Sequence, residues 1–315
     1  MPYASGRGLH QINTPLSNLS VKYSNDQSMF IAGNVFPQVP VKKETDSYYV
    51  FGRDNFLIPE TLRANKSPAN QSEYTLSTST YELERHSLRD LVSDRDRSNS
   101  DDALMPDVDT TEHLTEQVLL RKELQAANTL FTSTNFSNGH SLTSTLQWTD
   151  LTTTSDPIGD VATATTVILQ NSGRKPTNVI TGFEAFQGLQ NHPNILERIK
   201  YSERAIISEE LIASVFGVPR LNIGQAVYNT AKEGAAASMS YVWATDAWIG
   251  YLDQSTSLKS ASAVKTFVKS ERREMPFSVK KYRDEEREGD WIEVNSFFVT
   301  KPVATSAAYL VRGVS

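Results

Sequence analysis

The chain has 315 residues, a net charge of −6 and a sequence pI near 5.5. This acidic balance argues against a dedicated nucleic-acid binder, which normally carries a basic excess. The chain contains no cysteine, which excludes disulfides, thiol nucleophiles and cysteine-ligated zinc. No apolar run reaches the length of a membrane span, and no secretory signal follows Met1.

Residues 1–42 show no sustained helical or strand period and are broken by glycine and proline, which predicts an extended N-terminal arm. Two interpretations are open: a flexible tail, or an arm lying along a neighbouring subunit. The apolar Val35, Phe36, Val39 and Val41 favour the second, because a solvated tail has little use for them. The basic residues in and beside the arm are weak candidates for proximity to DNA phosphates: Arg7, Lys22, Lys42 and Lys43.

Residues 43–84 predict a long two-stranded hairpin. The aromatic stretch YYVFGRDNF (48–56) favours a strand, RANKSPANQS (63–72) a loop tip, and the alternating residues 73–84 a return strand. An isolated hairpin is marginal in water, so it packs either on its own core or on a neighbouring subunit. The mostly polar return strand favours a neighbour. The candidate inter-subunit contacts are Tyr48, Tyr49, Phe51, Phe56, Lys66, Tyr74 and Tyr81.

Residues 85–109 are dense in charge and predict a solvated or ion-paired linker. Its aspartates lack calcium-loop spacing and alternate with arginines, so we expect no metal site. A long helix over 107–131 follows, with Asp109 as cap and Glu112 completing a capping box. Its expected buried stripe is Leu120, Leu124, Ala127 and Phe131.

The rest of the chain predicts mixed helix and strand. We expect a loop with one short strand near Trp148, a helix from Asp156-Pro157 to Gly173, a strand at 178–181, and helices at 183–190 and 208–216. Strands follow at 221–228, and a strand pair at 239–252. A hairpin is expected from the flanks 277–282 and 291–300.

No catalytic constellation stands out. The five histidines are widely spaced, and Walker A, GxSxG and GxGxxG motifs are missing from the sequence. The carboxylate pairs Glu209–Glu210 and Glu285–Glu286 are sequence neighbours that do not share a face. We therefore expect no enzyme activity, no catalytic or metal-binding residue and no cofactor.

The order of arm, hairpin, long helix, α/β lobe, Trp-rich strands and late charged hairpin resembles the major capsid proteins of tailed bacteriophages. The stretches 35–56, 82–95 and 241–252 carry the resemblance most strongly. It implies an α+β fold of the Hong Kong 97 type. The implied divisions are an N-terminal arm (1–42), an extended loop (43–84), a peripheral domain (85–150) with spine helix 107–131, an axial domain (151–261), a return to the peripheral domain (262–302) and a C-terminal strand of the axial domain (303–315).

The resemblance also implies function and partners. The chain would assemble with itself into hexamers and pentamers of an icosahedral shell around double-stranded DNA, within the virion and built in the host cytoplasm. A separate scaffolding protein, a portal and a decoration or cement protein are the implied partners; a membrane is not. Some relatives join subunits through a loop-tip Lys and an Asn aided by a Glu, and Lys66, Asn295 and Glu293 are of those types. Most rely on non-covalent contacts or cement proteins.

Two further interpretations stay open. One is an encapsulin-type cellular compartment, which shares the same fold. The other is a surface hydrolase whose site is not visible in the sequence.

Overall fold

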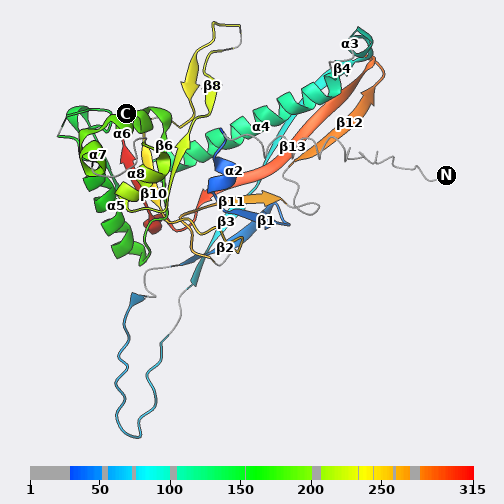
Figure 1. The fold of residues 1–315 in the computed structure, drawn as a ribbon. Helices are drawn as coiled ribbons and strands as arrows, with labels where there is room; N and C mark the ends of the chain where they lie inside the picture. The colour runs from blue at the N-terminus through cyan, green and yellow to red at the C-terminus, as the bar shows by residue number, and fades with distance from the viewer. Residues whose placement is uncertain are drawn as a thin grey trace.

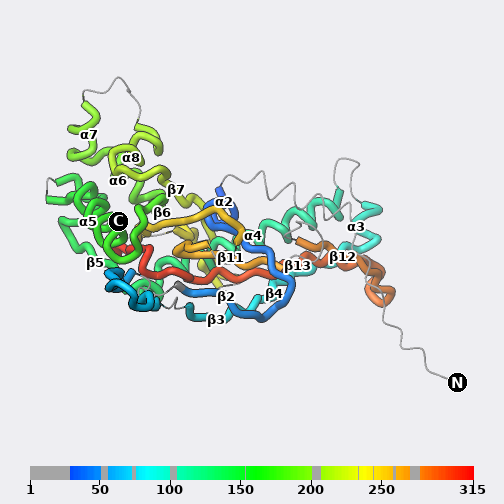
Figure 2. The backbone as a smooth tube through the Cα atoms, turned by 90° about the horizontal axis from the view of Figure 1, so that it is seen from below, coloured from blue at the N-terminus to red at the C-terminus, as the bar shows by residue number. Residues whose placement is uncertain are grey.

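The computed structural model describes residues 29–51, 56–72, 76–99, 105–152, 154–200, 207–232, 234–243, 245–257, 260–269 and 277–315. Two structured ends are joined by one long helix (Figures 1 and 2). One end is a helical lobe around a mixed sheet, and the other is a long sheet lying along helix α4. A narrow hairpin projects from the region where the two meet.

The long sheet has the order β1-β11-β13-β12, and β4 also pairs with β13. Its strands are β1 (Gln38–Val41), β4 (Glu84–Ser93), β11 (Val264–Lys269), β12 (Ser278–Asp284) and β13 (Gly289–Pro302). The expected late hairpin is thus confirmed as the antiparallel pair β12–β13. The expected linker at 85–109 is wrong in its first part: residues 84–93 form β4, whose register along β13 runs from Glu84–Phe298 to Ser93–Gly289.

Helix α4 (Pro106–Phe131) matches the expected spine helix. Its capping was predicted wrongly, because the helix begins at Pro106 with Met105 as N-cap, and Asp109 lies inside the first turn. Of the expected stripe, Ala127 is buried, and Leu120, Leu124 and Phe131 are partly buried against the core. The most deeply buried face lies about one residue earlier. It includes Val118, Leu119, Ala126 and Leu130, since the helix packs against the long sheet below it and against the junction with the lobe.

The lobe is built on the sheet β5-β14-β10-β6-β7. The strands are β5 (Gly139–Ser141), β6 (Asn178–Gly182), β7 (Arg220–Gly224), β10 (Ala247–Gly250) and β14 (Ala308–Arg312). The helices are α5 (Pro157–Ser172), α6 (Phe183–Asn191), α7 (Pro193–Ile199) and α8 (Glu209–Phe216). The expected stops of α5 and α8 are confirmed, because Gly173 and Gly217 adopt φ of 66° and 68°, a region that glycine enters at little cost.

Two expectations for the lobe are wrong. Trp148 lies outside any strand; it is fully buried and its indole N–H donates to Asp160 Oδ2 (2.9 Å). Residues 239–252 do not pair with each other either. Strand β9 (Met239–Tyr241) pairs with β8 (Val227–Asn229), whereas β10 is central in the lobe sheet.

The described part of the arm, residues 29–42, belongs to the subunit's own core. The short helix α2 (Ala32–Val35) packs near α4, and β1 pairs in parallel with β11. Val35, Phe36, Val39 and Val41 are all buried inside the subunit. The expectation that these four side chains lie on a neighbour is therefore wrong. The remainder of the arm, residues 1–28, lies outside the described residues.

Candidate assembly surfaces

The projecting hairpin is rooted in its own subunit. Strands β2 (Thr45–Phe51) and β3 (Leu76–Glu82) pair antiparallel, as expected. The rings of Tyr48 and Tyr81 lie 5.4 and 4.5 Å from the Phe267 ring, and both tyrosines are at most 5% exposed. The prediction that these two tyrosines contact a neighbouring subunit is therefore wrong. Because side chains alternate along a strand, both lie on the hairpin face that covers β11 and have little exposed surface left for a neighbour.

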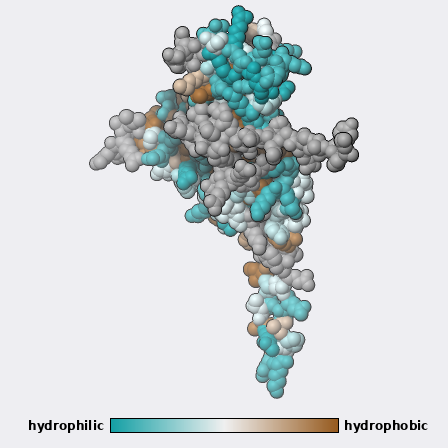
Figure 3. All heavy atoms as spheres, turned by 90° about the vertical axis from the view of Figure 1, so that its right-hand side faces the viewer, coloured by the Kyte–Doolittle hydropathy of each residue, from teal (hydrophilic) through white to brown (hydrophobic). Residues whose placement is uncertain are grey.

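Beyond the root, the hairpin exposes apolar side chains. Tyr49 and Phe56 are 37% and 65% exposed and remain candidates for contact with a neighbour. Three residues that the sequence analysis did not single out are more exposed still: Leu57 at 76%, Ile58 at 94% and Leu62 at 83%. The sequence FLIPETL (56–62) could have indicated them: it is mostly apolar, yet its proline prevents it from pairing as a central strand. Figure 3 shows the projecting hairpin as a stalk that carries brown, hydrophobic patches. The Phe51 side chain and Tyr74 lie outside the described residues.

The hairpin tip is organised by its own hydrogen bonds. The Asn70 side chain donates across the loop to the Glu60 carbonyl (2.7 Å), and the Ser67 hydroxyl donates to the Ala64 carbonyl (2.9 Å). Lys66 sits at the turn with a φ of 65°, which is uncommon for a residue other than glycine. Its ammonium group is exposed at the end of the stalk. The ordered turn therefore places the Lys66 backbone at the end of the stalk with its side chain in solvent.

The basic candidates near the arm are only partly described. Lys42 is exposed, and Lys43 forms a surface ion pair with Asp46 (3.5 Å). Arg7 and Lys22 lie outside the described residues. Asn295 is 2% exposed, and its amide donates to Glu293 Oε1 (2.7 Å) within β13.

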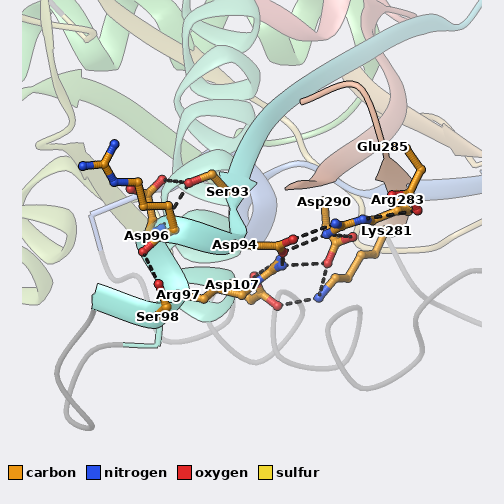
Figure 4. A network of polar contacts seen from close by, with 11 residues as sticks. Ser93, Asp94, Asp96, Arg97, Ser98, Asp107, Lys281, Arg283, Glu285 and Asp290 are labelled. Carbon is orange, nitrogen blue, oxygen red and sulfur yellow. Dashed lines mark hydrogen bonds and ion pairs between the residues drawn. The ribbon is translucent and has the colours of Figure 1, made fainter. Parts of the chain in front are cut away.

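The distal end of the long sheet holds an ion-pair network (Figure 4). The Arg97 guanidinium lies 2.8 Å from Asp107 and 2.9 Å from Asp290, and Lys281 approaches the same two carboxylates. Burial opposes ionisation of Asp107, but hydrogen bonds from Lys281 and Arg97 outweigh it and leave the pKa of Asp107 below its ordinary value. The charge-dense stretch is thus ion-paired, as expected, and ties α3 (Asp94–Asn99) and the start of α4 to β12 and β13.

A second network is buried in the middle of the subunit. Glu123 of α4, 1% exposed, accepts hydrogen bonds from the Ala32 backbone N–H (2.6 Å) and the Trp243 indole N–H (2.7 Å). Burial raises the pKa of Glu123 to about 7 and lowers the pKa of the adjacent Lys122 to about 8. The Lys122 ammonium lies 5.9 Å from the centre of the Phe298 ring. Sequence analysis missed both residues, because charged side chains in an amphipathic helix predict a solvated face.

Among the residues that the structure describes, the acidic and histidine side chains form no group of three able to hold a metal ion. The most suggestive chain is His140, which lies 3.1 Å from the Tyr309 hydroxyl and 3.3 Å from Asp160. These contacts link β5, β14 and α5 inside the lobe. None of the described helices is long and apolar enough to cross a membrane.

Comparison with known proteins gives two sequence relatives of one kind. No family model matches the chain. It is 28% identical over 243 residues to the major capsid protein of Burkholderia phage BcepMu, covering 74% of this chain and 77% of the relative. It is 25% identical over 248 residues to the major capsid protein of Pseudomonas phage JBD67, covering 77% and 78%.

Solved structures share the fold over nearly the whole chain. A phage-related protein from Bordetella bronchiseptica RB50 matches with a TM-score of 0.76 and 21% identity, covering 97% of this chain and 98% of that one. The capsid of Cyanophage P-SCSP1u matches with a TM-score of 0.60 and 9% identity, covering 99% and 92%. An encapsulin from Synechococcus elongatus PCC 7942 matches with a TM-score of 0.51 and 11% identity, covering 92% and 88%. The fold is therefore the α+β Hong Kong 97-like fold of phage capsids.

Proposed function

We propose that this chain, a major capsid protein of the phage type, assembles with its own copies into the hexamers and pentamers of an icosahedral shell around packaged double-stranded DNA. The observation that carries the proposal is the projecting hairpin. Its residues 56–62 expose four large apolar side chains: Phe56, Leu57, Ile58 and Leu62. A contact with another subunit would take them out of water.

The energetics support this role for the hairpin. Burying one large apolar side chain stabilises a contact by about 1.5–3 kcal/mol. Several of these side chains together contribute several kcal/mol per subunit, before the cost of association is subtracted. A closed shell repeats the same contact in every copy, so a modest gain per interface supports a stable particle.

An encapsulin-type compartment is the second candidate, since an encapsulin shares the fold. The two sequence relatives favour the phage assignment, because both are phage major capsid proteins. The neighbouring genes separate the candidates: portal and terminase genes indicate a phage, whereas a gene for a cargo enzyme indicates an encapsulin.

The remaining parts of the proposal concern location and partners. The virion capsid is the proposed location, and assembly takes place in the host cytoplasm with a separate scaffolding protein, a portal and a decoration or cement protein. Contact with DNA is weak and independent of sequence, because the chain carries a net charge of −6. Lys42 and Lys43 are the described candidates for such contact. Tight, sequence-specific binding by the free subunit would contradict this part.

Light scattering and cryo-electron microscopy of the purified protein test the proposal. We expect closed particles built from five- and six-membered rings. The proposed shell function would be wrong if the protein stayed a compact monomer under every assembly condition, including the presence of a scaffolding protein from the same genome.

A further inference from the structure

A second hairpin leaves the body on the side opposite to the first. Strands β8 and β9 pair only with each other among the described strands, and they point away from the projecting hairpin (Figure 1). A two-stranded ribbon is marginal in water by itself. This ribbon also exposes apolar side chains, with Met239 at 61% and Val227 at 42%. Both features indicate a surface that a partner covers.

A cleft lies at the foot of the β8–β9 ribbon, and one of the residues that line it, Glu184, is charged. It has a volume of about 400 Å³ and is lined by Glu184, Val227, Met239, Ser240 and Tyr241. Glu184 lies in the first turn of α6 with its side chain exposed. The lining also includes the apolar side chains of Val227 and Met239, and the Tyr241 ring lies 6.0 Å from that of Phe183. A ligand for this cleft therefore offers apolar side chains and a cation.

The projecting loop 56–72 offers that combination. Its apolar residues Leu57, Ile58 and Leu62 are followed by two cations, Arg63 and Lys66. The only carboxylate among these residues, that of Glu60, already accepts the Leu62 backbone N–H (2.8 Å). The loop and the ribbon are thus complementary in both hydrophobicity and charge.

Ring symmetry allows the two surfaces to meet. In a ring made by rotation, each subunit presents one side to one neighbour and the opposite side to the other. The loop and the ribbon lie on opposite sides of the subunit, so a ring whose contact uses these two sides sets the loop of one copy against the ribbon of the next. We propose that loop 56–72 of one subunit docks on the β8–β9 ribbon of the adjacent subunit, with its apolar residues on Met239 and Val227 and its cations facing Glu184. This inference rests on the proposed assembly into rings and names the receiving surface.

Engineered disulfides test the contact cleanly, because the chain has no cysteine of its own. A variant with Ile58→Cys and Met239→Cys is assembled, checked for shells by electron microscopy, oxidised and run on a non-reducing denaturing gel. We expect a ladder of covalent oligomers that reaches five- and six-subunit rings. The matched control pairs Ile58→Cys with Leu196→Cys, an apolar site on α7 that is 45% exposed, and should give no ladder.

Shells without a ladder, or equal ladders in both variants, would overturn the docking but leave the shell function intact. Failure of the unmodified protein to form any shell would instead contradict the proposed function.

Charge reversal gives an independent measurement. Glu184→Lys should raise the protein concentration needed for assembly roughly two- to fivefold, as expected for one partly exposed ion pair at each contact. Lys66→Glu and Arg63→Glu added together to Glu184→Lys should recover part of this loss. Glu210→Lys, at an exposed carboxylate on α8, is the control and should leave assembly unchanged. An equal effect of Glu184→Lys and Glu210→Lys, or no recovery in the combined variant, would overturn the assignment of Glu184.

Discussion

Glu123 is the side chain on which three separate segments of the subunit converge. It lies on α4 and accepts one N–H from Ala32 near the N-terminal side and one from Trp243 before β10. Trp243 is itself enclosed, with its ring 5.9 Å from Phe131 and 6.5 Å from Phe36. A single carboxylate thus holds the described arm and the lobe to the long helix.

Replacing Glu123 by Gln should destabilise the subunit by about 1–3 kcal/mol at pH 5. At this pH the folded Glu123 is a neutral carboxylic acid whose two oxygens can both accept an N–H, whereas the NH₂ group of an amide would face one of the two donors. The loss should shrink as the pH rises. The folded state holds the Glu123 proton up to a pKa of about 7, whereas the unfolded state releases it near its ordinary pKa, so the wild type loses stability between these values.

Urea unfolding of the monomeric subunit at pH 5 and pH 8 measures this difference. Glu116→Gln, at a half-buried carboxylate on the same helix, is the control and should cost less at both pH values. A variant whose loss grows with pH would show that the raised pKa is wrong.

Replacing Lys122 by Met should leave the stability unchanged or raise it by up to about 3 kcal/mol at pH 7, because the buried ammonium group is removed while the packing beside Phe298 is kept. The wild type should gain stability from about pH 8 upward, since the folded state has lost a proton that the unfolded state still binds. The variant should lack this gain. Unfolding curves at pH 7 and 9.5 measure it, with Arg121→Met, at an exposed neighbour, as control. Strong destabilisation at pH 7 would indicate that the charge is needed.

The sequence predicted individual helices and strands far better than the strands and side chains they pair with in the fold. Helix α5 and its Gly173 stop follow from local signals, namely a proline in the first turn and a glycine that tolerates positive φ. Strand β4 could not be predicted, because its charged face looks like a linker until β13, about two hundred residues away in the chain, supplies the pairing. Tyr48 and Tyr81 were similarly misassigned, because only the fold places Phe267 beneath them.

The ion-pair network at the distal end should stabilise the packing of α3 and the start of α4 against β12 and β13. Asp107→Asn removes the carboxylate shared by Arg97 and Lys281, and we expect a loss of about 1–2 kcal/mol at pH 7 and low salt. The loss should be smaller at 1 M salt because these side chains are partly exposed. It should also vanish as the pH falls below about 4, through the lowered pKa of Asp107.

Thermal unfolding across salt and pH measures this contribution. Asp109→Asn, an exposed carboxylate in the same first turn of α4, is the matched control. Equal losses in the two variants would mean that a general charge effect at the helix N-terminus, rather than the network, is responsible.

At the scale of the whole molecule, folding and assembly should depend on different parts of the chain. Replacing residues 57–75 by a short turn removes the exposed loop but keeps the root tyrosines on Phe267. The shortened subunit should keep its circular dichroism spectrum and melting temperature, because residues 57–72, the described part of the deletion, are exposed except for the half-buried Ser67. It should fail to yield stable shells in electron micrographs. A variant that unfolds, or one that still builds intact shells, would show that the loop has a different task.

Strand β13 gives the subunit a mechanical property. It runs for 14 residues, from its pairing with β12 and β4 at the distal ion pairs to its pairing with β11, which carries Phe267 under the hairpin root. Bending it sharply would break ladder hydrogen bonds with its neighbours. A load applied at one end of the subunit would therefore pass along β13 to the other end. In the shell that we propose, pressure from packaged DNA on the distal end would tilt the hairpin root, and with it the loop that we propose docks on the next subunit.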